Sequence, residues 1–133
     1  MKTVYIAHPI AGDRVNNMVS VLMIMKRLME GDDDIIPLAP YITTLLIYDD
    51  AITEERRRGM EQNERLIMNC NGIDEIWFYG DRMSEGMYME LALATERRIR
   101  VVGKTPETRV AIDKYIKEKG LERWHNQALY ETR

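Results

Sequence analysis

The chain contains short runs of consecutive apolar residues, and four of these runs have the composition of buried strands. β-Branched and aromatic residues are frequent in them, and glycine, proline or acidic residues lie close to their ends. We therefore predict strands at residues 3–7, 35–38, 74–79 and 99–103.

The segments between these runs carry apolar residues three and four positions apart, which is the spacing of a helix with one buried face. Four such segments are found, at residues 14–30, 53–69, 84–98 and 106–120. Residues 41–48 fit either a short helix or a lid. In the first helix, which Asp13 is expected to cap, the positions expected to face the core are Val15, Met18, Val19, Leu22, Met25 and Met29.

Strands that alternate with helices predict an α/β fold. We expect a single-domain doubly wound sheet, flavodoxin- or Rossmann-like, with four to five mainly parallel strands and helices on both faces. Residues 1–133 are expected to form one domain, in which the apolar tail 121–133 packs back or contacts another subunit. Ligands of such sheets bind at the carboxyl ends of the strands. We therefore expect the loops at residues 8–13, around Pro40 and at residues 80–84 to surround one crevice.

The loop at residues 80–84 is followed by a predicted helix whose first turn has the features of an anion-binding site. Ser84 is a suitable N-cap, and the backbone N–H groups after it attract anions such as phosphate. Gly86 and Glu90 are four residues apart on one helix face, so the missing side chain of Gly86 leaves space above the Glu90 carboxylate. A carboxylate beside a phosphate-sized site suggests a reaction on a phosphorylated sugar. The alternative is that Glu90 is an ordinary solvated helix glutamate.

The composition argues against several classes of partner. With 19 Lys and Arg against 22 Asp and Glu, the net charge of −3 argues against polymeric nucleic acid. The arginine run 56–58 is expected to be a solvated helix face. The single cysteine, Cys70, suits a reducing compartment, and no apolar run approaches the roughly 20 residues of a membrane span. We therefore expect a cytoplasmic protein with no membrane partner.

Motifs for cofactors and metals are missing from the sequence. No Gly-x-Gly-x-x-Gly fingerprint follows the first predicted strand, which argues against a dinucleotide. His8 and His125 are far apart in the sequence, and neither has a second histidine or a cysteine at ligand spacing. We expect no metal and no cofactor.

Two motifs resemble a known enzyme superfamily. Residues 5–13, Tyr-Ile-Ala-His-Pro-Ile-Ala-Gly-Asp, resemble the first strand and loop of the nucleoside 2-deoxyribosyltransferase superfamily. Residues 74–80, followed by Ser84-x-Gly86-Met87-x-x-Glu90, are similar to its strand and catalytic helix. The resemblance covers roughly residues 3–103 and implies a domain of that superfamily, which includes base-exchanging transferases and 5′-monophosphate N-glycosidases.

The resemblance implies roles for individual residues. Glu90 matches the nucleophile, Tyr5 matches the tyrosine that orients it, and the aspartate used near the leaving base falls close to Asn63. Ser84 and Gly86 match the residues that bind the 5′-phosphate in the nucleotide-hydrolysing branch. Further candidates for substrate binding are His8, Pro9, Gly12, Arg14, Asp49 and Met87, and candidates for the missing acid are Asp49, Asp50 and Glu64.

The sequence thus predicts cleavage of the N-glycosidic bond of a (deoxy)nucleoside or its 5′-monophosphate, by hydrolysis or base transfer. The partner is then a small-molecule nucleoside or nucleotide, and the resemblance implies a homodimer or a higher homo-oligomer. Two alternatives of other classes remain open. One is a nucleotide-binding module that senses its ligand without cleaving it, and the other is an α/β assembly protein whose apolar tail drives association.

Overall fold

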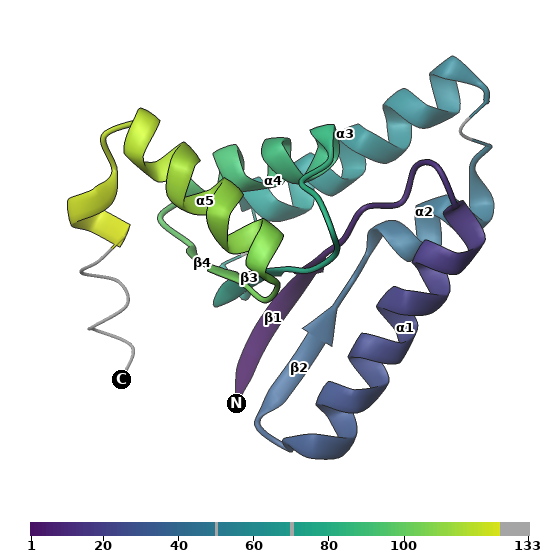
Figure 1. The fold of residues 1–133 in the computed structure, drawn as a ribbon. Helices are drawn as coiled ribbons and strands as arrows, with labels where there is room; N and C mark the ends of the chain where they lie inside the picture. Colours follow the sequence, from purple (N-terminus) through teal and green to yellow (C-terminus); the bar gives the residue numbers. More distant parts are fainter. Residues whose placement is uncertain (50, 70, 126–133) are drawn as a thin grey trace.

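Figure 1 shows the computed structural model, which describes residues 1–49, 51–69 and 71–125. All the predicted strands and helices are present, with ends that differ by a few residues, and the ambiguous piece at 41–48 forms a short helix. The strands are β1 (Lys2–Ala7), β2 (Ile35–Leu38), β3 (Glu75–Phe78) and β4 (Arg100–Gly103). The helices are α1 (Arg14–Gly31), α2 (Tyr41–Ile47), α3 (Thr53–Asn69), α4 (Glu85–Glu96) and α5 (Pro106–Glu118).

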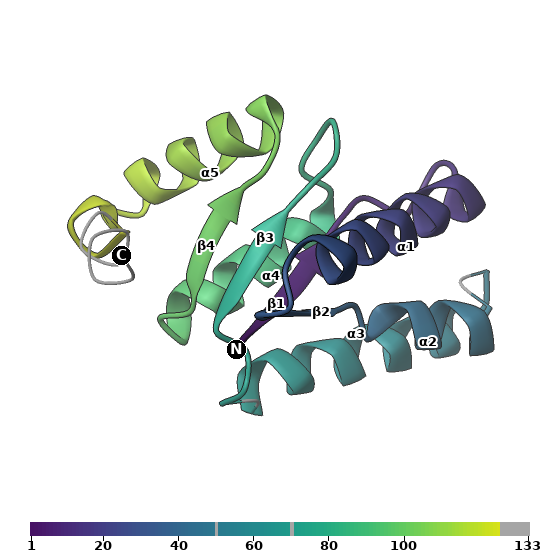
Figure 2. The same cartoon turned by 90° about the horizontal axis from the view of Figure 1, so that it is seen from below.

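The four strands form one parallel sheet in the order β2-β1-β3-β4, which Figure 2 shows from below. β1 lies inside the sheet, with Val4 opposite Pro37 of β2 and Tyr5 opposite Ile76 of β3. The chain steps from β1 outward to β2 and then crosses back to β3, so the direction of winding reverses between β1 and β3. In open α/β sheets a crevice opens at such a switch point. The predicted fold class is confirmed.

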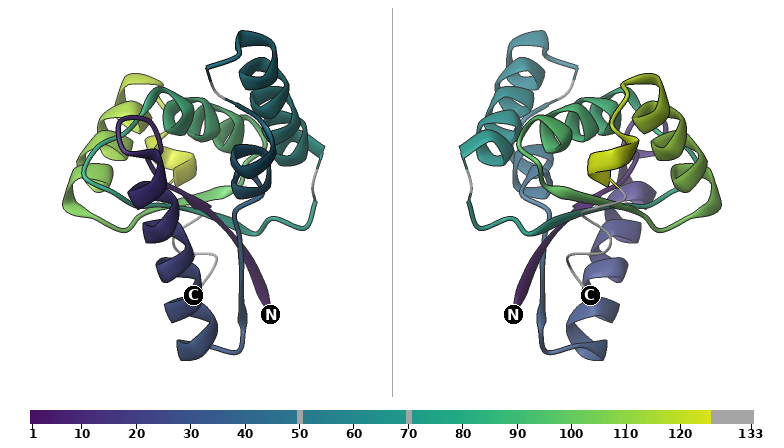
Figure 3. Two further views of the ribbon diagram at one scale, coloured as in Figure 1. Left: turned by 90° about the vertical axis from the view of Figure 1, so that its right-hand side faces the viewer. Right: turned by 90° about the vertical axis from the view of Figure 1, so that its left-hand side faces the viewer.

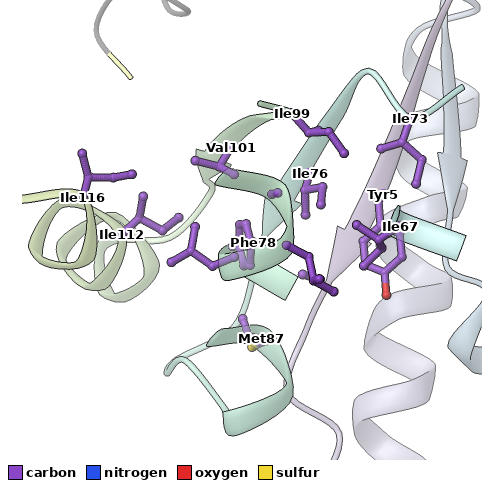
Figure 4. Close-up of a cluster of buried hydrophobic side chains, with 14 residues drawn as sticks. Tyr5, Ile67, Ile73, Ile76, Phe78, Met87, Ile99, Val101, Ile112 and Ile116 are labelled. Carbon is purple, nitrogen blue, oxygen red and sulfur yellow. The ribbon is translucent and has the colours of Figure 1, made fainter. Parts of the chain in front are cut away.

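Helices cover both faces of the sheet because alternate residues of a strand point in opposite directions. Val4 and Ile6 of β1 face α1, where Val21 is fully buried. Tyr5 and Ala7 point the other way, into the larger core that Figure 4 shows in close-up. β3 and β4 also contribute to this core, and helices α3, α4 and α5 pack onto it. Figure 3 shows these three helices on the side of the sheet opposite α1.

The buried face of α1 agrees only in part with the one that its spacing predicts: Met25 packs against the core and Met18 is half-buried, but other residues of α1 supply the rest. Val21 is fully buried, and Ile24 and Leu28 pack against the same core. α1 is apolar on two sides, so spacing alone does not choose between them. The Asn17 amide donates a 2.9 Å hydrogen bond to the Ile10 carbonyl oxygen, which orients the start of the helix. Of the predicted stripe, the residues left exposed to solvent are Val15, Val19, Leu22 and Met29.

Asp13 occupies the N-cap position of α1, but its side chain makes no capping hydrogen bond. Its Oδ2 atom instead accepts a 2.8 Å hydrogen bond from Asn16 Nδ2. The predicted N-cap position is therefore confirmed, but the Asp13 side chain does not cap the helix.

Part of the predicted tail packs back onto the domain. Leu121 and Trp124 contact the larger core, while Leu129, Tyr130 and the lone Cys70 lie outside the described residues. In the part of the chain that the structure describes, the helices lack the combined length and hydropathy of a membrane span.

Candidate active site

A cavity of about 380 Å³ opens where the carboxyl end of β1 meets α2, α3 and the start of α4. Its volume lies within the range of about 300–1,000 Å³ that is usual for small-molecule sites. The three loops that the sequence analysis brought together all contribute to it. The lining residues are His8, Ile10, Ala11, Tyr41, Thr44, Leu45, Arg56, Gly59, Met60, Asn63, Ser84, Glu85, Gly86, Met87, Met89 and Glu90.

Glu90 lines this cavity and is only 6% exposed. It lies on the buried side of α4, which also carries Met87 into the larger core. Burial raises the pKa of the Glu90 carboxyl to about 7, and interactions with Tyr5 and Asn63 oppose part of that rise. Glu90 is therefore not a solvated helix glutamate, and near neutral pH its protonated and ionised forms coexist.

Tyr5 and Asn63 meet beside Glu90. Tyr5 comes from β1 and is fully buried, and the Nδ2 atom of Asn63 on α3 donates a 2.6 Å hydrogen bond to the Tyr5 hydroxyl oxygen. Burial, followed by the nearby Glu90, raises the pKa of Tyr5 well above its usual value, so this hydroxyl keeps its proton. Because its oxygen already accepts from Asn63, the proton is available to the Glu90 carboxylate. The structure thus brings together the three residues to which the resemblance gives catalytic roles.

Two buried acceptors in this group have no partner. Glu90 Oε2 and Asn63 Oδ1 make no hydrogen bond with any described residue. An unsatisfied buried polar atom destabilises a fold by about 1–3 kcal/mol, and native proteins contain few of them. Two such acceptors at one cavity fit a site whose hydrogen-bond donors arrive with a ligand. A sugar, with its hydroxyl groups, carries donors of this kind.

The start of α4 faces the same cavity. Ser84 is its N-cap residue, and Ser84 Oγ accepts a 3.3 Å hydrogen bond from the Met87 backbone N–H, so the predicted cap is confirmed. A Cβ atom added at Gly86 would have no described atom within 4 Å, other than those of its own helix turn and chain neighbours, so the space there is open. The N–H groups of the first turn and this open space suit an anion.

Tyr41, the first residue of α2, is a site residue that the sequence analysis missed. Its hydroxyl donates a 2.5 Å hydrogen bond to the Ile6 carbonyl oxygen, and its ring centre lies 5.9 Å from that of Tyr5. Burial, followed by Glu90, raises the pKa of Tyr41 well above its usual value. Its place just after Pro40, at the end of β2, is the signal that marks it, because strand ends line the crevice.

Two further residues that the analysis missed hold the loop after β1 in place. Gly80 has a φ of +98°, and a Cβ atom there would lie 2.5 Å from Pro9 Cδ, so only glycine fits against this proline. Arg82 Nη2 donates a 2.8 Å hydrogen bond to the Ala11 carbonyl oxygen. These contacts tie the loop after β3 to the loop after β1. They arise from the tertiary fold, and the only local signal is the glycine at the end of a predicted strand.

The structure brings some of the predicted binding residues to the cavity and leaves others outside its wall. His8, Ser84, Gly86 and Met87 line it. The predicted candidates outside the wall are Pro9, Gly12, Arg14, Asp49 and Glu64.

The residues outside the wall make contacts of other kinds. Arg14 Nη2 donates a 3.3 Å hydrogen bond to the Tyr48 carbonyl oxygen. Asp49 Oδ1 accepts a 2.9 Å hydrogen bond from the Ala51 N–H, which stabilises the turn before α3. Asp50, the neighbouring candidate for the missing acid, lies outside the described residues.

The residues of this cavity do not suggest a metal centre. Among residues 1–49, 51–69 and 71–125, no three or more His, Cys, Asp or Glu side chains are grouped so as to hold a metal ion.

The sequence matches the family described as "Domain of unknown function (DUF7768)" over residues 2–104. The matched segment runs from β1 to β4 and includes all the residues that line the cavity. No curated protein matches the chain.

Proposed function

The chain belongs to the DUF7768 family, and from its site we propose that it is an enzyme that cleaves the N-glycosidic bond of a (deoxy)nucleoside or nucleoside 5′-monophosphate. The observation that carries this proposal is the Glu90 carboxylate, which is buried, has an unpartnered oxygen, and shares a cavity with the open start of α4. The two motifs that resemble the nucleoside 2-deoxyribosyltransferase superfamily support it, since Tyr5, Ser84, Gly86 and Glu90 belong to them.

In the first step, Glu90 acts as the nucleophile. Positive charge develops on the sugar ring as the C1′–N bond breaks, and an ionised carboxylate below the ring stabilises that charge. A bond forms between a Glu90 oxygen and C1′, while the electron pair of the broken bond leaves with the base. The Tyr5 hydroxyl holds the carboxylate in position, and Asn63 holds the hydroxyl.

In the second step, water or a second base attacks C1′ and releases the Glu90 carboxylate. With water the enzyme is a hydrolase: the oxygen bonds to C1′ and a proton is released. With a base it is a transferase, and the new C1′–N bond replaces the ester. The same pocket serves both reactions, because the acceptor enters the space that the first base leaves.

The 5′-phosphate is assigned to the start of α4. Its first-turn N–H groups and the positive end of the helix dipole attract an anion, and Gly86 leaves room for one. Ser84 Oγ accepts from Met87 N–H, and its own hydroxyl proton remains for a phosphate oxygen. His8, on the loop after β1, lines the same cavity and is a further candidate for binding the nucleotide.

A second candidate function is a nucleotide-binding module that senses its ligand without cleaving it. The observation in its favour is Asn63, an amide where the resemblance implies an aspartate that assists the leaving base. A sensor of this kind would use the same cavity but would release no base.

We also propose that the protein acts in the cytoplasm as a homodimer or a higher homo-oligomer. A single cysteine suits a reducing compartment. The apolar stripe that α1 leaves exposed, with Val15 71% and Met29 61% exposed, suits a contact between copies.

The test is incubation of the purified protein with a panel of nucleosides and 5′-monophosphates, followed by chromatography for free base. We expect base release from at least one member and none from an E90Q variant. Tight binding of a nucleotide, measured by calorimetry, without base release from any member would support the sensor and reject the enzyme.

A further inference from the structure

Arg56 shares one face of α3 with the site residue Asn63. Arg56, Gly59, Met60 and Asn63 all line the cavity, at relative positions 0, 3, 4 and 7, which is the repeat of a single helix face. Seven residues of helix rise by about 10 Å. Arg56 therefore lies two helical turns before Asn63 along the α3 wall of the cavity.

The neighbouring arginines are engaged elsewhere. Arg57 forms ion pairs with Glu54 and Glu61 on the exposed side of α3. The Arg58 guanidinium lies 5.8 Å from the centre of the Tyr48 ring. Arg56 forms no ion pair with any residue that the structure describes. The prediction that this run is a solvated face is confirmed, since Arg56, Arg57 and Arg58 are all exposed, and Arg56 also borders the cavity.

The proposed reaction requires a group that stabilises the leaving base. When the C1′–N bond breaks, negative charge develops on the departing base, and an acid usually neutralises it. The carboxylates that line the cavity are Glu90, the nucleophile, and Glu85, which is exposed in the first turn of α4. The amide of Asn63 already donates to Tyr5, and its Oδ1 atom is an acceptor. Of the described residues of α3, no glutamate lines the cavity.

We propose that Arg56 binds the carbonyl-bearing edge of the leaving base and stabilises the negative charge that develops on it. This inference rests on the proposed function. A guanidinium presents parallel N–H donors in a fixed fork, and it stays protonated at all physiological pH values. The electron pair of the C1′–N bond moves onto the base, the base departs as an anion held by Arg56, and it takes its proton from water after release. No acidic residue is required.

The test compares substrates whose bases differ in the negative charge that they carry as they leave. N7-methylguanine carries a positive charge in its nucleotide and leaves as a neutral base, whereas guanine leaves as an anion. For an R56Q variant we expect kcat for the guanine nucleotide to fall by about 100-fold, the usual effect of removing one group that stabilises developing charge. For the N7-methylguanine nucleotide we expect less than about threefold, since no negative charge develops. R56K should recover part of the loss.

R57Q is the matched control, because Arg57 carries the same charge on the exposed side of the same helix. Circular dichroism of each variant checks that it folds. Equal losses for both bases, or a loss confined to KM for 5′-monophosphates and absent with nucleosides, would overturn the inference and make Arg56 a structural residue or a phosphate ligand. Those results leave the proposed function standing. If the wild-type protein releases no base from any substrate, the proposed function fails, and this inference fails with it.

Discussion

Burial of Glu90 destabilises the fold while it prepares the site. Folding raises the pKa of this carboxyl from 4.5 to about 7, so the folded state binds the proton more tightly than the unfolded state does. The free energy of unfolding is therefore highest below about pH 4.5, where Glu90 is protonated in both states. It falls as the pH rises from there through about 7, because the ionised carboxylate is disfavoured in the folded state. At 1.36 kcal/mol per pKa unit, the loss is about 3 kcal/mol.

The E90Q variant should therefore be more stable than the wild type at alkaline pH. Glutamine keeps the shape of the side chain and removes its charge, so we expect a gain of up to about 3 kcal/mol at pH 8 and little change at pH 4. Urea unfolding followed by circular dichroism measures both values. E64Q, at an exposed position on α3, is the control and should change stability little at either pH. A gain for E90Q that is independent of pH would contradict the burial of an ionisable Glu90.

The site residues that the sequence reveals are those whose relation is fixed within one element. Ser84, Gly86 and Glu90 belong to α4 and its cap, so helix geometry alone gives their arrangement. Tyr41 is held at the cavity by its contact with Ile6, and Arg82 holds the loop after β1 through Ala11. Those contacts depend on how the elements dock, and local spacing carries no information about docking.

At the level of elements, α4 combines a structural task and a proposed functional one. Its inner face supplies Met87, Leu91 and Ala94 to the larger core, and this burial holds the helix in place. Its first turn stays open on the side of the cavity, because Gly86 has no side chain to fill that space. A helix fixed by its core face thus presents an unobstructed N-terminus.

A G86A variant separates the two tasks. The added methyl group meets no described atom, and alanine favours a helix, so stability should stay the same or rise by up to about 1 kcal/mol. The methyl group takes space that we assign to the phosphate, so KM for a 5′-monophosphate should rise by about tenfold or more. KM for the matching nucleoside should rise less. Steady-state kinetics with both substrates measures the difference, and an equal rise would argue against a phosphate at this helix start.

α1 shows that residue spacing can predict a helix without determining which of its faces is buried. Its spacing predicts a helix correctly but only part of the buried face. Met25 packs against the core as predicted, whereas Val21, Ile24 and Leu28 form a second apolar row, as regular as the predicted one. Both rows have helical spacing, and the choice between them depends on the sheet residues opposite. Val4 and Ile6 make that choice through tertiary packing.

At the scale of the whole molecule, the order of the strands determines where the site lies. The sheet could be predicted because four apolar runs alternate with helical segments, and parallel strands joined by helices cross over with one hand. The reversal of winding between β1 and β3 then opens the crevice beside Tyr5. The match to the DUF7768 family covers this whole arrangement.

Association through α1 is a property of the whole molecule that can be tested without a substrate. Leu22 is 50% exposed in the middle of the apolar stripe, so an L22K variant places a charge in the proposed contact. We expect the wild type to elute as a dimer or larger species in size-exclusion chromatography with light scattering, and L22K as a monomer. S20K, which adds the same charge at an exposed position outside the stripe, should keep the wild-type mass. A monomeric wild type would contradict the proposed contact.

The most direct measurement asks whether the sugar becomes attached to Glu90. A nucleotide with fluorine at C2′ in the arabino configuration slows the loss of the glycosyl-enzyme, because fluorine disfavours positive charge on the ring. After incubation with such a nucleotide, mass spectrometry of the intact protein should show the mass of one sugar phosphate, and peptide mapping should locate it on Glu90. The E90Q variant should carry no adduct and release no base. An adduct on another residue, or base release from E90Q at the wild-type rate, would contradict the assignment of Glu90 as the nucleophile.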